Sequence, residues 1–230
     1  MNLQTQSGAD GTIKLIWDNI DTVLLDMDGT LLDLNYDNHV WNQLLPAAYA
    51  RQHRLEPEQA RTQLFEHMMK IRGSMAFYTF RYWSEYCGVD LVALHQQATE
   101  LVQLRPGTGP FLSWLRQQSK RAIIATNADR ASVQIKQSRV NLDNLVDRII
   151  SSHDYTYPKE DPMFWQSLSE QVSYDPTRTL FIDDNEPVLD AAAAAGIGTL
   201  LCVNTPDSSR PKRQDLRYPS FDHYDEIYSP

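Results

Sequence analysis

The sequence has little positive charge. Lys and Arg number 21 against 30 Asp and Glu, so the 230-residue chain carries a formal net charge of -9. A nucleic-acid-binding surface normally shows a basic patch, and this balance therefore argues against nucleic acid as a partner. It does not exclude a small anionic ligand, because a metal ion or a few cationic side chains can set the local field.

Cysteine and long hydrophobic runs are also scarce. The two cysteines, Cys87 and Cys202, are far apart and have no metal-binding spacing; one disulfide is an open alternative, but reduced thiols are favoured. No apolar stretch approaches the roughly 18 residues that a membrane span needs. The first twenty residues contain no apolar segment of signal-peptide length. We therefore expect a cytoplasmic protein without a membrane partner.

Short apolar runs alternate with helical patterns along most of the chain. The apolar runs predict strands at residues 23–26, 121–126, 148–151, 179–183 and 199–203, and the helical spacing predicts helices at 111–118, 130–139, 162–171 and 186–195. This alternation is typical of an α/β fold with a parallel sheet. Residues 1–20 and 204–230 show neither pattern, so we expect a loose lead-in and an irregular tail.

Strand-like runs are absent between residues 35 and 104. Helical spacing predicts four helices there, at residues 38–51, 56–71, 77–86 and 90–102. This insert begins soon after Asp28 and ends before the second predicted strand. We therefore expect one α/β core, formed by residues 1–34 and 105–230, that is interrupted by a helical insert of residues 35–104.

Two carboxylates follow the first apolar run. Asp26 and Asp28 lie in the sequence Asp-Met-Asp-Gly-Thr, which predicts a turn at the carboxyl end of a buried strand. Burying two aspartates there is costly unless a cation compensates them. The stretch is therefore a candidate metal-dependent site.

Polar side chains also follow the other predicted strands. Thr126 and Asn127 come after the second strand, Lys159 stands in the loop after the third, and Asp183 and Asp184 end the fourth. Ligands of open parallel sheets bind beyond the carboxyl ends of the strands. We therefore expect all these side chains at one edge of the sheet.

These motifs, in this order, resemble the haloacid dehalogenase (HAD) superfamily. The four motifs are Asp26 to Thr30, the apolar strand that ends at Thr126, Lys159, and the pair Asp183 and Asp184. The resemblance implies a Rossmann-like HAD core. It also identifies the helical insert as a type-one (C1) cap, because that cap is inserted at the same place.

The resemblance implies Mg²⁺ as a cofactor, which fits the preference of this ion for a few carboxylates together with substrate phosphate. Asp26 would be both nucleophile and metal ligand. Asp28 would bind the metal through its backbone carbonyl and transfer protons with its side chain. Asp184 would be a direct ligand, with Asp183 helping directly or through water.

The phosphoryl group would be held by Thr126, the backbone amide of Asn127, and Lys159. In the expected reaction Asp26 attacks phosphorus to give an aspartyl phosphate while Asp28 protonates the leaving alcohol; Asp28 then takes a proton from the water that hydrolyses this intermediate. The dehalogenases of the superfamily lack an aspartate at the position of Asp28, which argues against dehalogenation here.

A longer resemblance covers most of the chain and points to the bacterial nucleotidases of this superfamily that act on GMP and IMP. It rests on residues 21–34, 82–85, 157–161, 179–184, 189–193 and 204–208. It implies a phosphomonoesterase for purine nucleoside 5′-monophosphates. The same chemistry on another small phosphate, such as a sugar phosphate or phosphoglycolate, stays open, as do a mutase and a non-catalytic binding module.

The insert contains side chains that suit a nucleotide. Its aromatic residues include Tyr36, Trp41, Phe77, Tyr78, Tyr82 and Trp83, and its cations Lys70 and Arg72 are candidates to meet polar groups of a substrate. The alternative for each aromatic residue is a place in the core of the insert. The alternative for the two cations is a solvated helix end.

Overall fold

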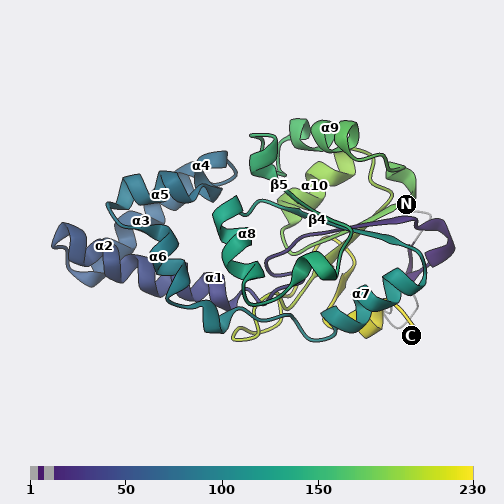
Figure 1. Cartoon of the computed structure of the whole chain (residues 1–230), viewed down its shortest axis with the longest axis horizontal. Helices are drawn as coiled ribbons and strands as arrows, with labels where there is room; N and C mark the ends of the chain where they lie inside the picture. The colour runs from purple at the N-terminus through teal and green to yellow at the C-terminus, as the bar shows by residue number, and fades with distance from the viewer. Residues whose placement is uncertain (1–4, 8–12, 230) are drawn as a thin grey trace.

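The computed structural model describes residues 5–7 and 13–229, and a parallel sheet forms its centre. The strand order is β5-β4-β3-β6-β7-β8. The strands are β3 (Thr22–Leu25), β4 (Arg121–Thr126), β5 (Arg148–Ser151), β6 (Thr179–Asp183), β7 (Thr199–Val203) and β8 (Ser220–Phe221). The α/β fold predicted from the alternating pattern is therefore confirmed (Figure 1).

Helices cover both faces of this sheet. They are α7 (Thr108–Gln117), α8 (Arg130–Gln137), α9 (Pro162–Gln171) and α10 (Glu186–Ala194). Val23 and Leu25 of β3 belong to one apolar cluster with residues of α7 and α8, whereas Leu24 belongs to a second cluster with residues of α9 and α10. Burial on both faces explains why the strands are continuous apolar runs. It leaves the carboxyl ends of the strands as the place for polar side chains.

The helices between β3 and α7 gather at one end of the molecule, on the left in Figure 1. They are α1 (Asn35–His39), α2 (Leu45–His53), α3 (Pro57–Ile71), α4 (Met75–Tyr78), α5 (Phe80–Cys87) and α6 (Leu91–Gln96), with a π-helical turn at Val40–Leu44. We call these helices the cap helices. The boundaries of the insert as a separate domain stay a prediction.

Two of the predicted cap helices begin at other residues than expected because of polar contacts. The first begins at Asn35 rather than at residue 38, since the Asp33 carboxylate accepts a hydrogen bond from the Asn35 backbone N–H (2.9 Å). The helix predicted at residues 77–86 is divided between α4 and α5. The new start at Phe80 has a partner far away in sequence, because its N–H donates to the carboxylate of Asp129 (3.1 Å).

The last cap helix is shorter than the predicted range of residues 90–102. It ends at Gln96, and a separate 3-10 turn follows at Thr99–Leu101. The hydroxyl of Tyr36 donates to the carbonyl oxygen of His95 (3.1 Å). This carbonyl therefore has a partner outside the helix, at the place where the helical hydrogen bonding stops.

The prediction of a loose lead-in is wrong for the residues that the structure describes, whereas the tail is irregular as predicted, apart from the two residues of β8 and a 3-10 turn at Tyr224–Glu226. β1 (Thr5–Ser7) pairs antiparallel with β2 (Ile13–Leu15); residues 1–4 and 8–12 of the lead-in lie outside the described residues. In the tail, β8 joins β7 through a hydrogen bond from Asn204 N–H to the Phe221 carbonyl (3.0 Å). A strand of two residues is too short to produce an apolar pattern.

Two further expectations concern the cysteines and membranes. Cys87 and Cys202 are buried and unpaired, which confirms the prediction of reduced thiols. Within residues 5–7 and 13–229, no helix has both the length and the apolar character to cross a membrane.

Candidate active site

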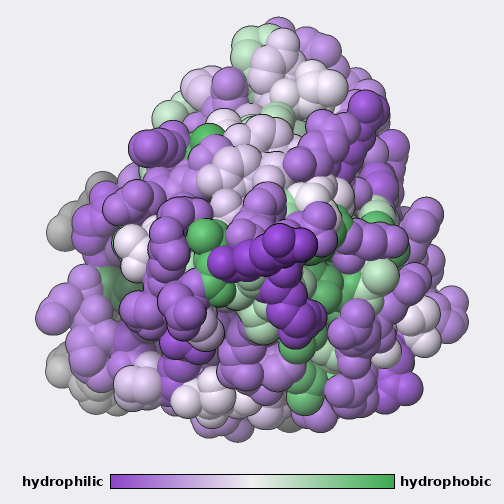
Figure 2. All heavy atoms as spheres, turned by 90° about the vertical axis from the view of Figure 1, so that its left-hand side faces the viewer, coloured by the Kyte–Doolittle hydropathy of each residue, from purple (hydrophilic) through white to green (hydrophobic). Residues whose placement is uncertain are grey.

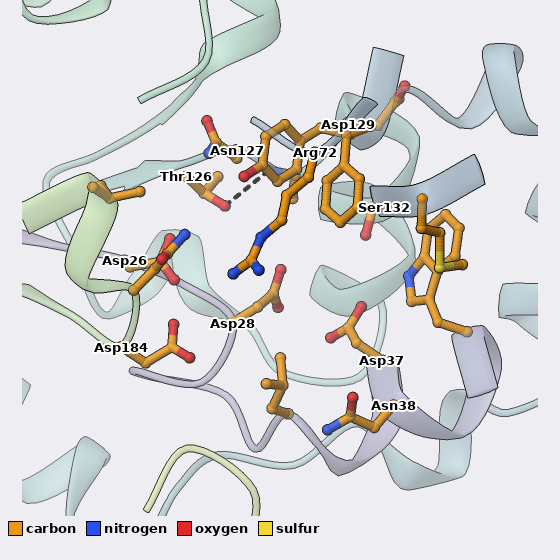
Figure 3. Close-up of a pocket in the computed structure, with 18 of the residues that line it drawn as sticks. Asp26, Asp28, Asp37, Asn38, Arg72, Thr126, Asn127, Asp129, Ser132 and Asp184 are labelled. Carbon is orange, nitrogen blue, oxygen red and sulfur yellow. Dashed lines mark hydrogen bonds between the residues drawn. The ribbon is translucent and has the colours of Figure 1, made fainter. Parts of the chain in front are cut away.

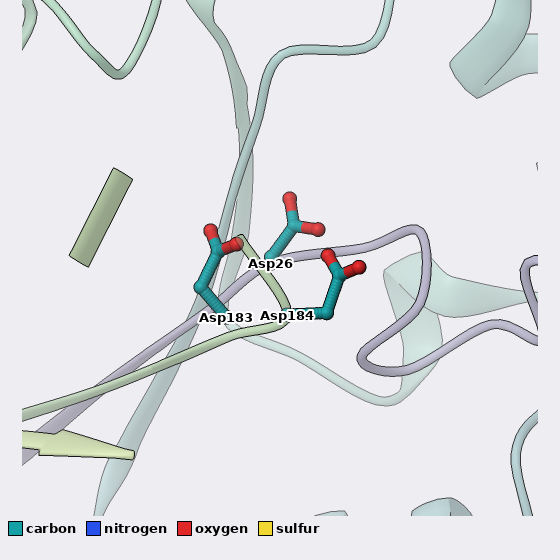
Figure 4. Close-up of side chains that lie close together, drawn as sticks. All are labelled: Asp26, Asp183 and Asp184. Carbon is teal, nitrogen blue, oxygen red and sulfur yellow. The ribbon is translucent and has the colours of Figure 1, made fainter. Parts of the chain in front are cut away.

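Three carboxylates meet where β3 and β6 end. The two strands are paired in register, with Leu25 opposite Ile182, so Asp26 and Asp183 follow at neighbouring positions, and Asp184 comes next. One carboxylate oxygen of each aspartate lies within 4.8 Å of the others. Figure 4 shows all three carboxyl groups pointing to the same side. The expected convergence at one edge of the sheet is therefore present.

The environment of these carboxylates opposes their ionisation. Burial is the main cause that raises the pKa of Asp26 to about 7 and that of Asp184 to about 7, and neighbouring carboxylates add to both shifts. Burial likewise raises the pKa of Asp183 to about 6. A divalent cation would displace protons from such a cluster. The all-oxygen donor set fits Mg²⁺, which suits this cofactor prediction.

Lys159 is the cation that the structure places against this cluster. Its ammonium donates to Asp26 Oδ1 (2.5 Å) and to Asp183 Oδ2 (2.7 Å). Its backbone is also fixed, because its N–H donates to Asn127 Oδ1 (2.8 Å) and its carbonyl accepts from Trp165 Nε1 (2.7 Å). Burial lowers the pKa of Lys159, but the two carboxylates outweigh this effect and raise it, so the side chain stays charged.

Gly29 allows the turn after Asp28 to approach the carboxylate cluster. Its φ angle is +81°, a conformation that side chains with a Cβ rarely adopt. A Cβ atom there would lie 2.8 Å from Cγ of Asp184 and 3.0 Å from Cβ of Pro206. Glycine is therefore needed for both the backbone conformation and the close packing.

Thr126 and Asn127 stand at the end of β4, as expected from the sequence. Thr126 Oγ1 accepts a hydrogen bond from the backbone N–H of Ala128 (3.0 Å), and both residues line the same cavity as the carboxylates (Figure 3). The Asn127 side chain donates to Glu160 (2.9 Å), and Glu160 in turn accepts from the hydroxyl of Tyr78 in the cap helices (2.5 Å). The phosphate-binding candidates are thus connected to the cap.

Four charged residues of the cavity lining were not among the sequence candidates, namely Asp37, Asp129, Lys136 and Arg213, and two of them contact the site residue Asp28 or each other. The ammonium of Lys136, on α8, lies 2.7 Å from Asp28 Oδ1 and 2.8 Å from Asp37 Oδ1, and Asp37 is on α1. Neither residue is part of a motif. The only sign of Lys136 in the sequence is a lysine among the apolar residues of α8, and such lysines are common on half-buried helices.

A cavity of about 560 Å³ extends from the carboxylates to the cap helices. Its floor is formed by the strand ends, and its far walls include Trp41, Phe65, Met68, Met69, Phe77 and Trp83. Phe65 and Met69 are largely exposed, at 64% and 49%. Figure 2, which faces the cap helices, shows hydrophobic side chains grouped within a mostly hydrophilic surface. We call the charged strand ends the floor of the cavity and the apolar side chains of the cap helices its roof.

The predicted substrate residues fall into two groups. Trp41, Tyr78, Trp83 and Arg72 line the cavity, although Trp83 is fully buried and its indole N–H donates to the carbonyl of Phe77 (2.8 Å). Figure 3 shows Arg72 extending toward the space between Asp26 and Asp28. Tyr36 requires a correction, since it does not line this cavity. Its side chain is buried, and its hydroxyl is hydrogen-bonded to His95 Nδ1 (2.9 Å). A base cannot stack on it, so the alternative of a place in the core of the insert describes it better.

Three comparisons with known proteins agree with this architecture. The chain is 38% identical over 212 residues to the GMP/IMP nucleotidase YrfG of Escherichia coli, covering 92% of this chain and 96% of that protein. A phosphoglycolate phosphatase of Pseudomonas putida is 26% identical over 103 residues, 45% of this chain and 38% of that protein. Among solved structures, a HAD phosphatase from Thermococcus onnurineus superposes with a TM-score of 0.74 at 20% identity, covering 90% and 95% of the two chains.

A family model also places the chain among the HAD hydrolases. The model of the haloacid dehalogenase-like hydrolases matches residues 20–196, which include β3, the cap helices and β6. The matched range contains all the motif residues considered above. The chain belongs to the haloacid dehalogenase-like hydrolases.

Proposed function

We propose that this phosphoric monoester hydrolase releases phosphate from purine nucleoside 5′-monophosphates, with GMP and IMP as its preferred substrates and Mg²⁺ as its cofactor. The observation that carries the proposal is the single cavity that joins Asp26, Asp28, Thr126 and Lys159 to the apolar side chains of the cap helices. The similarity to a GMP/IMP nucleotidase over 92% of the chain supports the choice of substrate.

The reaction begins with the carboxylate of Asp26. It attacks phosphorus and forms an aspartyl phosphate, while the bond from phosphorus to the 5′ oxygen breaks and Asp28 gives that oxygen a proton. Asp28 then accepts a proton from water, which attacks the aspartyl phosphate and releases inorganic phosphate and free Asp26. Thr126 and Lys159 stabilise the charge that develops on the equatorial oxygens.

Asp26, Asp183 and Asp184 are the side chains that would hold Mg²⁺, together with the backbone carbonyl of Asp28. The bound cation would offset the repulsion between an anionic nucleophile and an anionic substrate. The raised pKa values of the three carboxylates are consistent with this role, since each is expensive to ionise without a cation.

The cap helices would select the leaving group. A purine has two apolar faces, and Trp41, Phe65 and Phe77 line the cavity beyond the phosphate site. Arg72 is a cation of the same wall and would contact oxygens of the ribose phosphate.

The cytoplasmic location and the absence of a nucleic-acid partner stay predictions from the sequence.

The test is phosphate release from a panel that contains GMP, IMP, AMP, a sugar phosphate and phosphoglycolate, with Mg²⁺ or with EDTA. We expect kcat/KM for GMP and IMP to exceed the other values by about tenfold or more, and EDTA to abolish release. Equal turnover of all five compounds would contradict the nucleotide proposal. Preference for phosphoglycolate or the sugar phosphate would favour the second candidate, and no turnover of any compound would favour a binding module.

A further inference from the structure

A buried lysine lies beside the residue proposed to transfer protons. The Lys136 side chain is 1% exposed, and its ammonium is 2.7 Å from Asp28 Oδ1. It reaches this place from α8, which follows β4. Within the described residues, no other lysine, arginine or histidine nitrogen lies within 4.0 Å of the Asp28 carboxylate. The contact with Lys136 is therefore the one ion pair of the Asp28 carboxylate among the described residues.

The cap helices contribute to the same contact. Asp37, on α1, places Oδ1 2.8 Å from the Lys136 ammonium, and the ring of Tyr36 lies 5.4 Å from it. Oδ2 of Asp37 and Oδ1 of Asp28 are buried and have no hydrogen-bond partner in the described part of the chain, so the contact of Asp28 Oδ1 with the ammonium is an ion pair. One ammonium thus holds a carboxylate of the core and a carboxylate of the cap, which face the same part of the cavity in Figure 3.

We propose that Lys136 is the positioning residue of Asp28: its ammonium, shared with Asp37, holds the Asp28 carboxyl group where it meets the leaving oxygen. This inference rests on the proposed function. With Oδ1 fixed by Lys136, the second oxygen of Asp28 is left for the substrate and then for water. Since Asp37 belongs to the cap helices, the arrangement of the cap and the position of Asp28 depend on one contact.

Stability alone does not account for a lysine at this position. Removing two carboxylates and an ammonium from water is costly, and apolar residues of similar volume often serve the fold equally well or better. Position 136 follows two apolar residues of the same helix that are themselves buried, Val133 and Ile135. A methionine would fill similar space without charge. Orientation of the Asp28 carboxylate would explain why position 136 has a charged side chain.

The test separates the proton-dependent steps from attack on phosphorus. A nucleoside is a poor leaving group and needs a proton, whereas p-nitrophenolate leaves without one. For Lys136→Met we expect kcat with GMP to fall about 100-fold, the order of an acid–base contribution. The first-turnover release of p-nitrophenolate from p-nitrophenyl phosphate should stay within about threefold of wild type, because Asp26 is unchanged. Steady-state turnover of that compound should fall, because hydrolysis of the aspartyl phosphate still requires Asp28.

Two further variants keep this test decisive. Lys136→Gln keeps a polar side chain of similar length and should show the same separation between the two substrates, while Lys136→Arg should recover part of the GMP turnover because it restores the charge. Lys120→Met is the control. It removes a partly buried lysine that donates to the carbonyl of Trp17 (2.8 Å), and it should change neither kcat with GMP nor the first-turnover release of p-nitrophenolate. If Lys136→Met and Lys136→Gln lose as much first-turnover release of p-nitrophenolate as they lose kcat with GMP, the role of Lys136 is structural and the proposal is overturned. Wild-type turnover of GMP by these variants would also overturn it. Failure of the wild-type enzyme to release phosphate would instead refute the proposed function.

Discussion

The floor and the roof of the cavity differ in how their side chains are held. On the floor, Asp26, Lys159 and Asp183 are buried and joined by contacts of 2.5 and 2.7 Å. On the roof, Phe65 and Met69 are 64% and 49% exposed. Groups that react must be held in one geometry, whereas apolar surface for a leaving group needs only shape and area. The difference fits the proposal that the core carries out the chemistry and the cap selects the substrate.

The largest effect is expected from removing the proposed nucleophile from the floor of the cavity. Asp26→Asn should lower kcat with every phosphomonoester by about 10⁴-fold or more, because no carboxylate remains to form the intermediate. Phosphate release measures the loss, and thermal unfolding checks that the protein is folded. Asp190→Asn is the matched control, since Asp190 pairs with Arg217 on the surface and should leave turnover unchanged.

A second prediction concerns the interior of the cap, where His95 is fully buried and neutral. Burial lowers the pKa of His95 to about 3, whereas in the unfolded chain it is near 6.5. The unfolded state therefore gains a proton first, and the contribution of His95 to stability, present above pH 6.5, is lost as pH falls. We expect it to lower the free energy of unfolding by about 1.4 kcal/mol per pH unit between pH 6 and 4.

Denaturant unfolding of wild type and His95→Gln at several pH values measures this contribution. The variant should have a shallower dependence on pH over that range, although its stability at pH 7 is lower. Identical slopes for the two proteins would show that His95 takes up a proton in the folded cap.

A smaller effect should follow from changing the cation of the roof. Arg72 makes no ion pair with any described residue within 4.0 Å, yet it extends over the floor in Figure 3. Arg72→Met should raise KM for GMP by about tenfold, the value of one charge-assisted hydrogen bond, with a smaller change for p-nitrophenyl phosphate. Arg61→Met is the control, because Arg61 is exposed and lies on α3, the helix that ends just before Arg72. Equal effects of both variants would indicate only a change in overall charge.

The smallest effect concerns the link between roof and floor. The hydroxyl of Tyr78 donates to Glu160 (2.5 Å), which also accepts from Asn127 (2.9 Å). Tyr78→Phe removes one hydrogen bond and should lower kcat/KM for GMP by about three- to tenfold. Tyr155→Phe removes a longer bond to Gln171 (3.4 Å), away from the cavity, and should have no effect on kcat/KM. A loss confined to Tyr155→Phe would contradict the proposed link.

The floor could be predicted from sequence for a physical reason. Each of its candidates follows an apolar strand, and parallel strands bring their carboxyl ends together whatever connects them. Asp26, Thr126, Lys159 and Asp183 were therefore expected at one edge, and the structure places them there. The five longer strands were predictable because burial on both faces makes them continuous apolar runs.

The features that could not be predicted depend on contacts between distant segments. Lys136 has the sequence context of an ordinary helical lysine, and only the folded chain brings it beside Asp28, in the turn after β3, and Asp37, on α1. The start of α5 depends on Asp129, which comes from beyond β4. Tyr36 and Trp83 have the same helical context, yet only Trp83 reaches the cavity wall. Such differences appear only when the elements are packed together.

Trapping of the covalent intermediate tests the central claim most directly. The enzyme is mixed with GMP and Mg²⁺, quenched in acid within the first turnover, digested, and analysed by mass spectrometry. We predict a phosphoryl group on Asp26 in the wild-type protein and none on the same peptide in Asp26→Asn. Phosphate release without any phosphorylated residue, or with the phosphoryl group on another residue, would contradict the assignment of Asp26 as the nucleophile.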